Sequence, residues 1–218
     1  MKIDPNDTLL FIGDSITSAA RDFNQPGEGN DAAFGDGYVR AIRSLLDAVY
    51  PASKIRVINK GVGGHTIRDL SNRWEQDVIA LSPDWLSVMI GINDVWRQFD
   101  RPLITECHVL PDEYESTYRQ LLDQTRPLLK GLVIASPYVI DLNTQDAMRN
   151  RMDQYREIAA RMAEEYDAVY VDSQSLFDSY LQHYHPNQLC WDRIHPSASG
   201  HMLIARGWLN AMGFDWWG

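Results

Sequence analysis

The chain has 218 residues, with 20 basic and 30 acidic side chains that give a net charge of −10, and only two cysteines. This length is short for two full domains but sufficient for one hydrophobic core, so a scaffold built on disulfides is excluded. The acidic balance and the lack of a run of Lys and Arg argue against nucleic acid or an anionic membrane surface as a partner.

The first seven residues contain acidic side chains and a proline where a secretory signal has an apolar segment. The sequence has no run of 18 apolar residues, so it predicts no membrane-spanning helix. We therefore expect a cytoplasmic protein in which Cys107 and Cys190 are reduced.

Short apolar runs alternate with stretches of amphipathic helical spacing along the whole chain. In chain order, the spacing predicts a strand at 9–12, a helix at 39–49, a strand at 55–58, a helix at 67–80, a strand at 85–90, a helix at 112–129, a strand at 131–135, a helix at 155–166, a strand at 169–171 and a helix at 197–212. This alternation is typical of a parallel sheet covered by helices. Without a composition break, a repeat or a linker, residues 1–218 are expected to form a single domain.

Two connections, 17–36 and 173–194, are longer than simple turns. The first is rich in Gly, Asn and Asp, and long loops in compact domains are usually functional. The second is expected to hold a short helix around 176–181.

Small and polar residues follow each of the first three predicted strands, at 13–15, 61–65 and 91–94, and residues 192–196 precede the last predicted helix. Ligands of open parallel sheets bind beyond the carboxyl ends of the strands. We therefore expect these segments to meet at one edge of the sheet.

Ser15 directly follows the first strand, where its hydroxyl can be exposed as a nucleophile; capping a turn or helix is the simpler interpretation of this serine. Asp192 lies three residues before His195, close enough to orient the imidazole as a base. Pro196 keeps His195 out of the α region. No Gly-x-Ser-x-Gly motif is present, which argues against the nucleophile elbow of the α/β-hydrolases.

Acyl transfer also needs donors for the negative charge that develops on the carbonyl oxygen. The amides of Ser15 and Gly64 and the side chain of Asn93 are candidates for this oxyanion hole. We expect Asp14 and Asp94 to brace the loops rather than to react.

These segments resemble the blocks of the SGNH-hydrolase (GDSL esterase/lipase) superfamily. The matching residues are 11–17, 59–66, 91–94 and 192–196, in that order and over nearly the whole chain. The resemblance implies a flavodoxin-like, three-layer α/β/α sandwich with strand order 2-1-3-4-5. It also implies a triad of Ser15, His195 and Asp192, an oxyanion hole of Ser15, Gly64 and Asn93, and no metal or organic cofactor.

Segments 60–70, 89–98, 152–155 and 200–205 are similar to those of intracellular bacterial acetylxylan esterases. This similarity implies removal of O-acetyl groups from xylo-oligosaccharides, with a small acetylated sugar as substrate, and assembly into a homo-oligomer. The chain departs from many relatives at Gly63, Gly64 and His65, where those carry Ser-Gly-Asn or Ser-Gly-Asp.

Aromatic residues lie beside the candidate site and at the C-terminus. Trp96 and Trp191 could stack on sugar rings or pack in the core or between subunits. Phe214, Trp216 and Trp217 are difficult to bury in an isolated domain, so we expect them to form a subunit contact.

Other activities receive less support. His183, His185, Cys190 and His195 are zinc-ligand types, but His195 already has a partner in Asp192, so we predict no metal. The motifs of nucleotide-binding loops are absent. The alternatives to an acetyl esterase are an esterase or thioesterase for another short acyl group, or a non-catalytic ligand-binding domain of the same fold.

Overall fold

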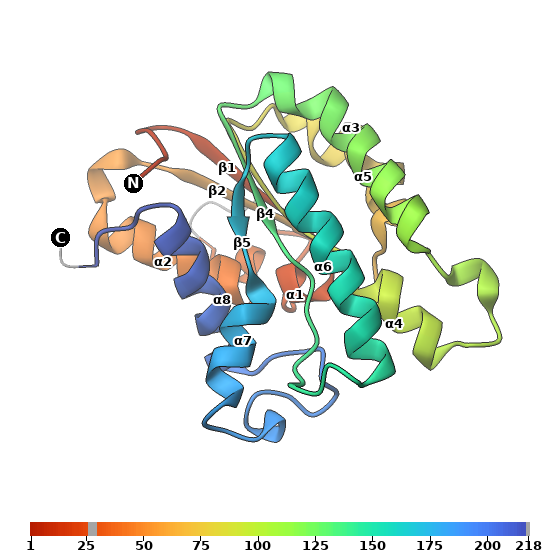
Figure 1. Cartoon of the computed structure of the whole chain (residues 1–218). Coiled ribbons are helices and arrows are strands. Elements are labelled where there is room, and N and C mark those ends of the chain that lie inside the picture. The colour runs from red at the N-terminus through yellow and green to blue at the C-terminus, as the bar shows by residue number, and fades with distance from the viewer. Residues whose placement is uncertain (26–29, 217–218) are drawn as a thin grey trace.

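A five-stranded parallel sheet forms the centre of the computed structural model, which describes residues 1–25 and 30–216 (Figure 1). Its strands are Thr8–Gly13 (β1), Arg56–Gly61 (β2), Trp85–Met89 (β3), Gly131–Ala135 (β4) and Val169–Val171 (β5). The strand order is β2-β1-β3-β4-β5, which confirms the predicted order. Strand β2 lies on one side of β1, and β3 to β5 follow on the other side. Because the strands are parallel, the carboxyl ends of β2, β1 and β3 lie next to one another at one edge of the sheet.

Helices cover both faces of this sheet. They are Ser15–Ser18 (α1), Tyr38–Val49 (α2), Ile67–Asp77 (α3), Ile92–Asp100 (α4), Pro111–Thr125 (α5), Ala147–Glu165 (α6), Ser173–Leu181 (α7) and Ala198–Ala211 (α8). Helices α2 and α8 pack together on one face, and α3, α5 and α6 form the layer on the other (Figure 1). The predicted three-layer sandwich is therefore confirmed.

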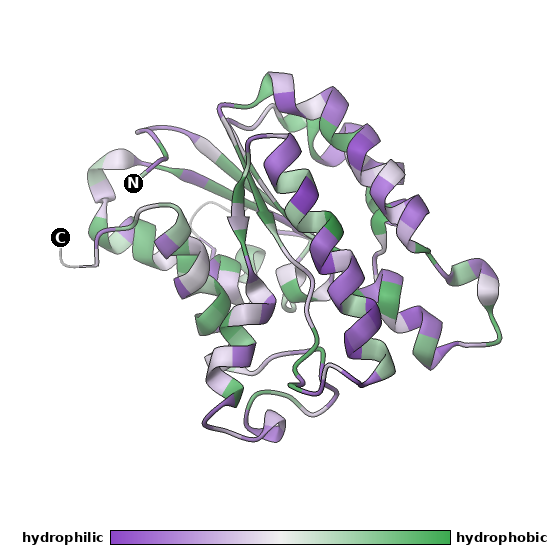
Figure 2. Cartoon of the chain, in the orientation of Figure 1, coloured by the Kyte–Doolittle hydropathy of each residue, from purple (hydrophilic) through white to green (hydrophobic). Residues whose placement is uncertain are grey.

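Buried apolar residues fill the spaces between the layers, and the helices carry their hydrophilic residues on the outside (Figure 2). Large buried aromatic side chains connect the elements through ring contacts and hydrogen bonds. The Trp208 ring packs on Phe11, with centroids 5.3 Å apart, and its indole N–H donates to Ser87 at 3.0 Å. On the other face, Trp74 donates to Thr125 at 2.7 Å and joins α3 to α5.

The element boundaries differ from the predictions at several points. Helix α5 ends at Thr125 rather than at 129, because Pro127 lacks the N–H that a continued helix requires and instead lies in a short 3₁₀ turn. Helix α3 ends at Asp77, three residues before the predicted end, and is followed by another 3₁₀ turn. Helix α4 was not predicted, since a Gly and an Asn-Asp pair immediately after a strand are typical of a loop.

The C-terminal aromatic residues are less exposed than expected. Phe214 is only 6% exposed and packs edge-on against Tyr50, with ring centroids 5.4 Å apart. Trp216 is 42% exposed and donates its indole N–H to Asn210. Trp217 lies outside the described residues. The expectation that these aromatic residues are difficult to bury in an isolated domain is therefore wrong for Phe214.

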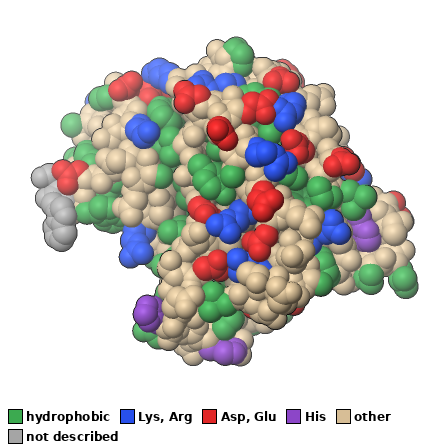
Figure 3. All heavy atoms as spheres, in the orientation of Figure 1, with side chains coloured by type: hydrophobic (Ala, Val, Ile, Leu, Met, Phe, Trp, Pro, Cys, Tyr) green, Lys and Arg blue, Asp and Glu red, His purple; other side chains and the backbone are tan. Residues whose placement is uncertain are grey.

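The surface mixes charges of both signs. Figure 3 shows Lys and Arg side chains interspersed with Asp and Glu over the face that it displays. Among the described residues, no helix is both long and apolar enough to cross a membrane.

Candidate active site

The hydroxyl of Ser15 is placed at the carboxyl end of the central strand. Strand β1 ends at Gly13, and Asp14 then caps the short helix α1 by accepting the N–H of Ile16 at 2.9 Å. Ser15 is the first residue of that helix and is half-buried. Its side chain therefore lies at the edge of the sheet, as predicted.

His195 lies at hydrogen-bonding distance from Ser15, although 180 residues separate the two in sequence. The distance from Ser15 Oγ to His195 Nε2 is 2.9 Å. On the other side of the ring, Nδ1 lies 2.5 Å from Oδ2 of Asp192. Because the carboxylate of Asp192 accepts from Nδ1, the neutral ring carries its hydrogen there and presents Nε2 as the acceptor for the serine proton.

The main chain between Asp192 and His195 folds around the aspartate side chain. Asp192 Oδ1 accepts the N–H groups of Ile194 at 3.0 Å and His195 at 2.8 Å. Burial alone would raise the pKa of the Asp192 carboxyl, but its bonds to the His195 ring and to these two amides outweigh burial and lower the pKa. The carboxylate is therefore ionised and fixed in place.

The two further candidate donors are Gly64, on the loop after β2, and Asn93, at the start of α4. Gly64 has φ of +81° and no atom within 4 Å of the position that a Cβ would occupy, so its surroundings are open. Asn93 is buried in the first turn of α4, and its side-chain N–H₂ donates to the carbonyl of His65 at 3.0 Å. This hydrogen bond joins the loop of Gly64 to α4 and leaves one amide hydrogen of Asn93 unused by it.

Two arginines support the site, and neither was predicted from the sequence. Arg97 donates to Asn93 Oδ1 at 3.1 Å, one helical turn further along α4. Arg73 donates to His65 Nδ1 at 3.1 Å and to the carbonyl of Gly13 at 3.1 Å. The spacing of four residues between Asn93 and Arg97 is the only sequence signal for these contacts, and it has meaning only once 92–100 is known to be helical.

Asp14 and Asp94 are fully buried carboxyl groups beside these loops. One oxygen of Asp94 accepts the N–H of Ile67 at 2.9 Å, and the second oxygen of each aspartate has no partner among the described residues. Burial raises the pKa of both carboxyls to about 7, although their main-chain bonds partly oppose this shift. The expected bracing role agrees with these contacts.

The aromatic candidates occupy different environments. Trp96 is half-buried and meets the ring of His195 edge-on, with centroids 5.8 Å apart. Trp191 is 87% exposed, and its side chain forms no hydrogen bond or ring contact with the residues that the structure describes. Within 1–25 and 30–216, no three His, Cys, Asp or Glu side chains gather in a way that could hold a metal ion, including those at 183–195.

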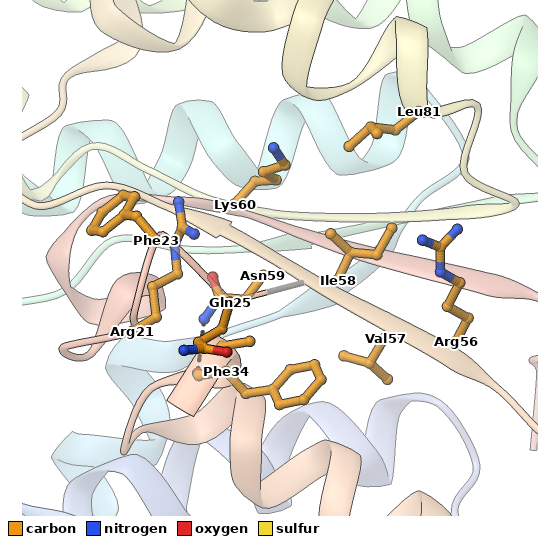
Figure 4. A pocket seen from close by; sticks show the side chains of 11 residues that line it. Arg21, Phe23, Gln25, Phe34, Arg56, Val57, Ile58, Asn59, Lys60 and Leu81 are labelled. Carbon is orange, nitrogen blue, oxygen red and sulfur yellow. Dashed lines mark hydrogen bonds between the residues drawn. The ribbon is translucent and has the colours of Figure 1, made fainter. Parts of the chain in front are cut away.

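A hollow of about 500 Å³ opens beside Ser15 and His195. Another, of about 270 Å³, lies along the edge strand β2, where Arg21, Arg56 and Lys60 contribute cationic side chains (Figure 4). The two hollows share no lining residue, and the second contains none of the candidate catalytic groups. The chemistry is therefore expected in the first.

The fold and these contacts define a class of protein, namely a flavodoxin-like α/β sandwich with a Ser–His–Asp arrangement at the carboxyl edge of its sheet. The model of the GDSL-like Lipase/Acylhydrolase family matches residues 11–203, and the chain belongs to this family. The resemblance found in the sequence is thereby confirmed.

Esterases from Geobacillus are similar to this chain over nearly their full length. An acetylxylan esterase from Geobacillus stearothermophilus is 52% identical over 216 residues, which are 99% of this chain and 98% of the relative. A solved variant of an acetyl-xylooligosaccharide esterase from Geobacillus has a TM-score of 0.97 and 51% identity, covering 99% of this chain and 98% of its own. Further solved structures, with TM-scores of 0.96, are catalytic mutants of the Geobacillus acetylxylan esterase in which a Ser, an Asp or a His is replaced by Ala.

Proposed function

We propose that this protein is a serine esterase that removes O-acetyl groups from acetylated xylo-oligosaccharides. The single observation that carries the proposal is the continuous contact from Ser15 through His195 to Asp192. The names of the relatives, and the residue types changed in their catalytic mutants, support the same substrate and the same three side chains.

The reaction proceeds in two acyl-transfer steps. His195 Nε2 takes the proton of Ser15 as Oγ attacks the acetyl carbonyl, and Asp192 stabilises the imidazolium that forms. The imidazolium then gives the proton to the departing sugar oxygen, which leaves an acetyl group on Ser15. Water repeats the attack with His195 as base and releases acetate.

The oxyanion is held by hydrogen-bond donors from three segments of the chain, namely the start of α1, the loop after β2 and the start of α4. These are the main-chain N–H groups of Ser15 and Gly64 and the side-chain amide of Asn93. Support comes from the open surroundings of Gly64 and from the His65 carbonyl, which orients the Asn93 amide. Such donors stabilise the transition state because they are already aligned before charge develops.

Trp96 and Trp191 are proposed as substrate contacts. Trp96 meets the ring of His195, which places an apolar surface beside the reacting ester. The exposed ring of Trp191 directly precedes Asp192 and offers a stacking surface for a sugar.

The remaining expectations complete the proposal. Residues 1–218 act as one catalytic domain, in the cytoplasm, without a metal or organic cofactor. The half-exposed Trp216 supports assembly of several copies through the C-terminal segment.

Acetate release tests the proposed activity. The protein is incubated with acetylated xylo-oligosaccharides and with 4-nitrophenyl esters of acetate and of a long-chain acid. We expect turnover of the acetates and little of the long-chain ester, and loss of all turnover in Ser15→Ala with an unchanged circular dichroism spectrum. Equal rates on the long-chain ester would refute the acetyl assignment, and a fully active Ser15→Ala enzyme would refute the nucleophile.

A further inference from the structure

The hollow beside Ser15 is too large for an acetyl group alone. Its volume of about 500 Å³ lies within the ~300–1,000 Å³ that is typical of sites for small organic ligands. Small side chains, including Ala19 and Ala198, form much of its wall, while Asp36 and His201 supply polar groups. Nothing in the mechanism above uses either of these two residues.

His201 is held in one orientation by the start of α2. The main-chain N–H of Tyr38 donates to His201 Nδ1 at 3.2 Å, and the two rings are nearly parallel, with centroids 6.5 Å apart. A Cβ on Gly37 would lie 2.8 Å from His201 Cε1, so the ring fits closely against the chain. An N–H group can only donate, so Nδ1 is the acceptor and the hydrogen of the neutral ring is on Nε2.

This second imidazole stays neutral where an esterase works. Burial, and to a smaller extent the charge of His195, lowers the pKa of His201 to about 4. Within the described part of the chain, Nε2 of His201 forms no hydrogen bond. It is also not one of the fully buried side-chain atoms that have no hydrogen-bond partner there. Because His201 lines the hollow, its N–H is a donor that a ligand there can reach.

We propose that this hollow binds the sugar ring that carries the acetyl ester, with His201 Nε2–H donating to one ring hydroxyl and the Asp36 carboxylate accepting from another. The proposal rests on the proposed function. A donor and an acceptor on the wall of one hollow complement the hydroxyls of a pyranose, which no acyl chain carries.

The alcohol side of the ester belongs here because His195 must return its proton to the sugar oxygen. His195 and Ser15 both line this hollow, whereas Gly64 and Asn93 do not. The carbonyl oxygen therefore points away from the hollow, towards its donors.

The binding surface continues past His201. A neighbouring hollow of about 320 Å³ shares Asp36, Ala198 and His201 with the first and extends over Arg40 and Ser44 of α2. A further sugar unit of the same chain would lie there. The structure thus favours an oligosaccharide over a monosaccharide as substrate.

The test compares two substitutions of His201. In His201→Asn, the short side chain keeps an acceptor for Tyr38 but does not reach the position of Nε2. In His201→Gln, the longer side chain carries an amide N–H to about that position. The matched control is His183→Asn, which makes the same change at an exposed loop position whose side chain forms no hydrogen bond within residues 1–25 and 30–216.

We measure kcat/KM for an acetylated xylobioside and divide it by kcat/KM for 4-nitrophenyl acetate. The second substrate lacks sugar hydroxyls. We expect His201→Asn to lower this ratio about five- to tenfold, the worth of one hydrogen bond, and His201→Gln to restore most of it. The ratio in His183→Asn should equal that of the wild type. Loss of activity on both substrates to the same extent would show a structural role for His201 and overturn the proposal.

A deoxygenated substrate identifies the hydroxyl and separates the two proposals. On an acetylated xylobioside that lacks the hydroxyl bound by His201, the wild type and His201→Asn should have the same rate. Suppose that the wild type releases acetate from the xylobioside, but that wild type and His201→Asn still differ in rate on every deoxygenated form. The proposed sugar site would then be overturned, and the proposed esterase activity would stand. If the wild type hydrolyses only the nitrophenyl ester, the proposed function fails, and the sugar site with it.

Discussion

Arg97 fixes which way the amide of Asn93 faces. The guanidinium can only donate, so the Asn93 oxygen faces Arg97 and the N–H₂ group faces the His65 carbonyl. The same guanidinium lies 4.8 Å from the centre of the Trp96 ring, which in turn contacts His195. A single arginine therefore orients the side chain that we propose as an oxyanion donor and packs beside the aromatic neighbour of His195.

Replacing Arg97 by Met should slow catalysis without abolishing it. The aliphatic stem of the methionine retains packing on Trp96, but the Asn93 amide becomes free to rotate, and we expect kcat to fall about tenfold with little change in KM. Asn93→Ala, which removes the donor itself, should cost about 10²–10³ in kcat. Steady-state kinetics on 4-nitrophenyl acetate measure both, with Arg101→Met at the exposed end of α4 as control. An Arg97→Met enzyme with unaltered kcat would show that the amide is oriented without the arginine.

The raised pKa of Asp94 makes the free energy of unfolding fall as pH rises. A carboxylate in an ordinary ion pair has a lowered pKa, and its effect has the opposite sign. The folded pKa of Asp94, about 7, exceeds the usual 3.8, so the native state binds more protons than the unfolded chain between these values. Stability therefore falls as pH rises from about 4 to 7 and stays low above that range. At about 1.4 kcal/mol per pKa unit, the loss is at most about 4 kcal/mol.

Asp94→Asn should flatten this dependence, because the amide has the shape of the protonated carboxyl and keeps an oxygen for the N–H of Ile67. Urea unfolding from pH 5 to pH 8 measures the effect. We expect the free energy of unfolding of the wild type to decline across this range more than that of the variant, with the variant more stable at pH 8. Parallel curves would mean that Asp94 is ionised throughout.

At the scale of elements, the junction of β1 and α1 has no room for a side chain. A Cβ on Gly13 would lie 2.2 Å from the Met89 carbonyl at the end of β3 and 2.4 Å from Thr17 Oγ1. Backbone must therefore move if any other residue replaces this glycine. The close approach of β1 to β3 sets the distance between Ser15 and Asn93.

Gly13→Ala is expected to lower the free energy of unfolding by at least about 2 kcal/mol and to reduce kcat in the molecules that remain folded. Gly63→Ala is the matched control for stability, since its Cβ would meet nothing closer than the Ser15 Cβ at 3.8 Å. Thermal unfolding of both variants compares the two positions. Equal melting temperatures would contradict the steric argument.

Hydrophobic periodicity was sufficient to locate the sheet and its main helices, since the buried strands are nearly continuous apolar runs. It failed at α4, where only nine residues separate Gly91 from Arg101 and the first turn carries Asn93 and Asp94. The local pair of Asp192 and His195 could be anticipated from its spacing. The contacts of Arg73 and Arg97 could not, because they depend on how separate loops and helices pack.

At the scale of the whole molecule, the N-terminal segment contacts the segment that follows α8. The N–H of Lys2 donates to the Met212 carbonyl at 2.9 Å, and Phe214 packs on Tyr50 at the end of α2. The C-terminal segment is therefore part of the same folding unit as β1. Of its described aromatic residues, Phe214 is buried in the chain and Trp216 is partly exposed.

Substitutions of these two aromatics should separate folding from association. Phe214→Ala removes a buried ring and is expected to cost about 3–5 kcal/mol of stability, seen as a lower urea midpoint. Trp216→Ala removes a ring that is 42% exposed, with a hydrogen bond to Asn210 and an edge contact with Phe214, so the melting temperature of the dissociated chain should fall less than in Phe214→Ala. If Trp216 lies between subunits, size-exclusion chromatography at micromolar concentration should give an assembly for the wild type and a smaller species for Trp216→Ala. A wild-type chain that already elutes at 25.0 kDa would refute the interface, because the exposed indole would then face solvent rather than a second copy.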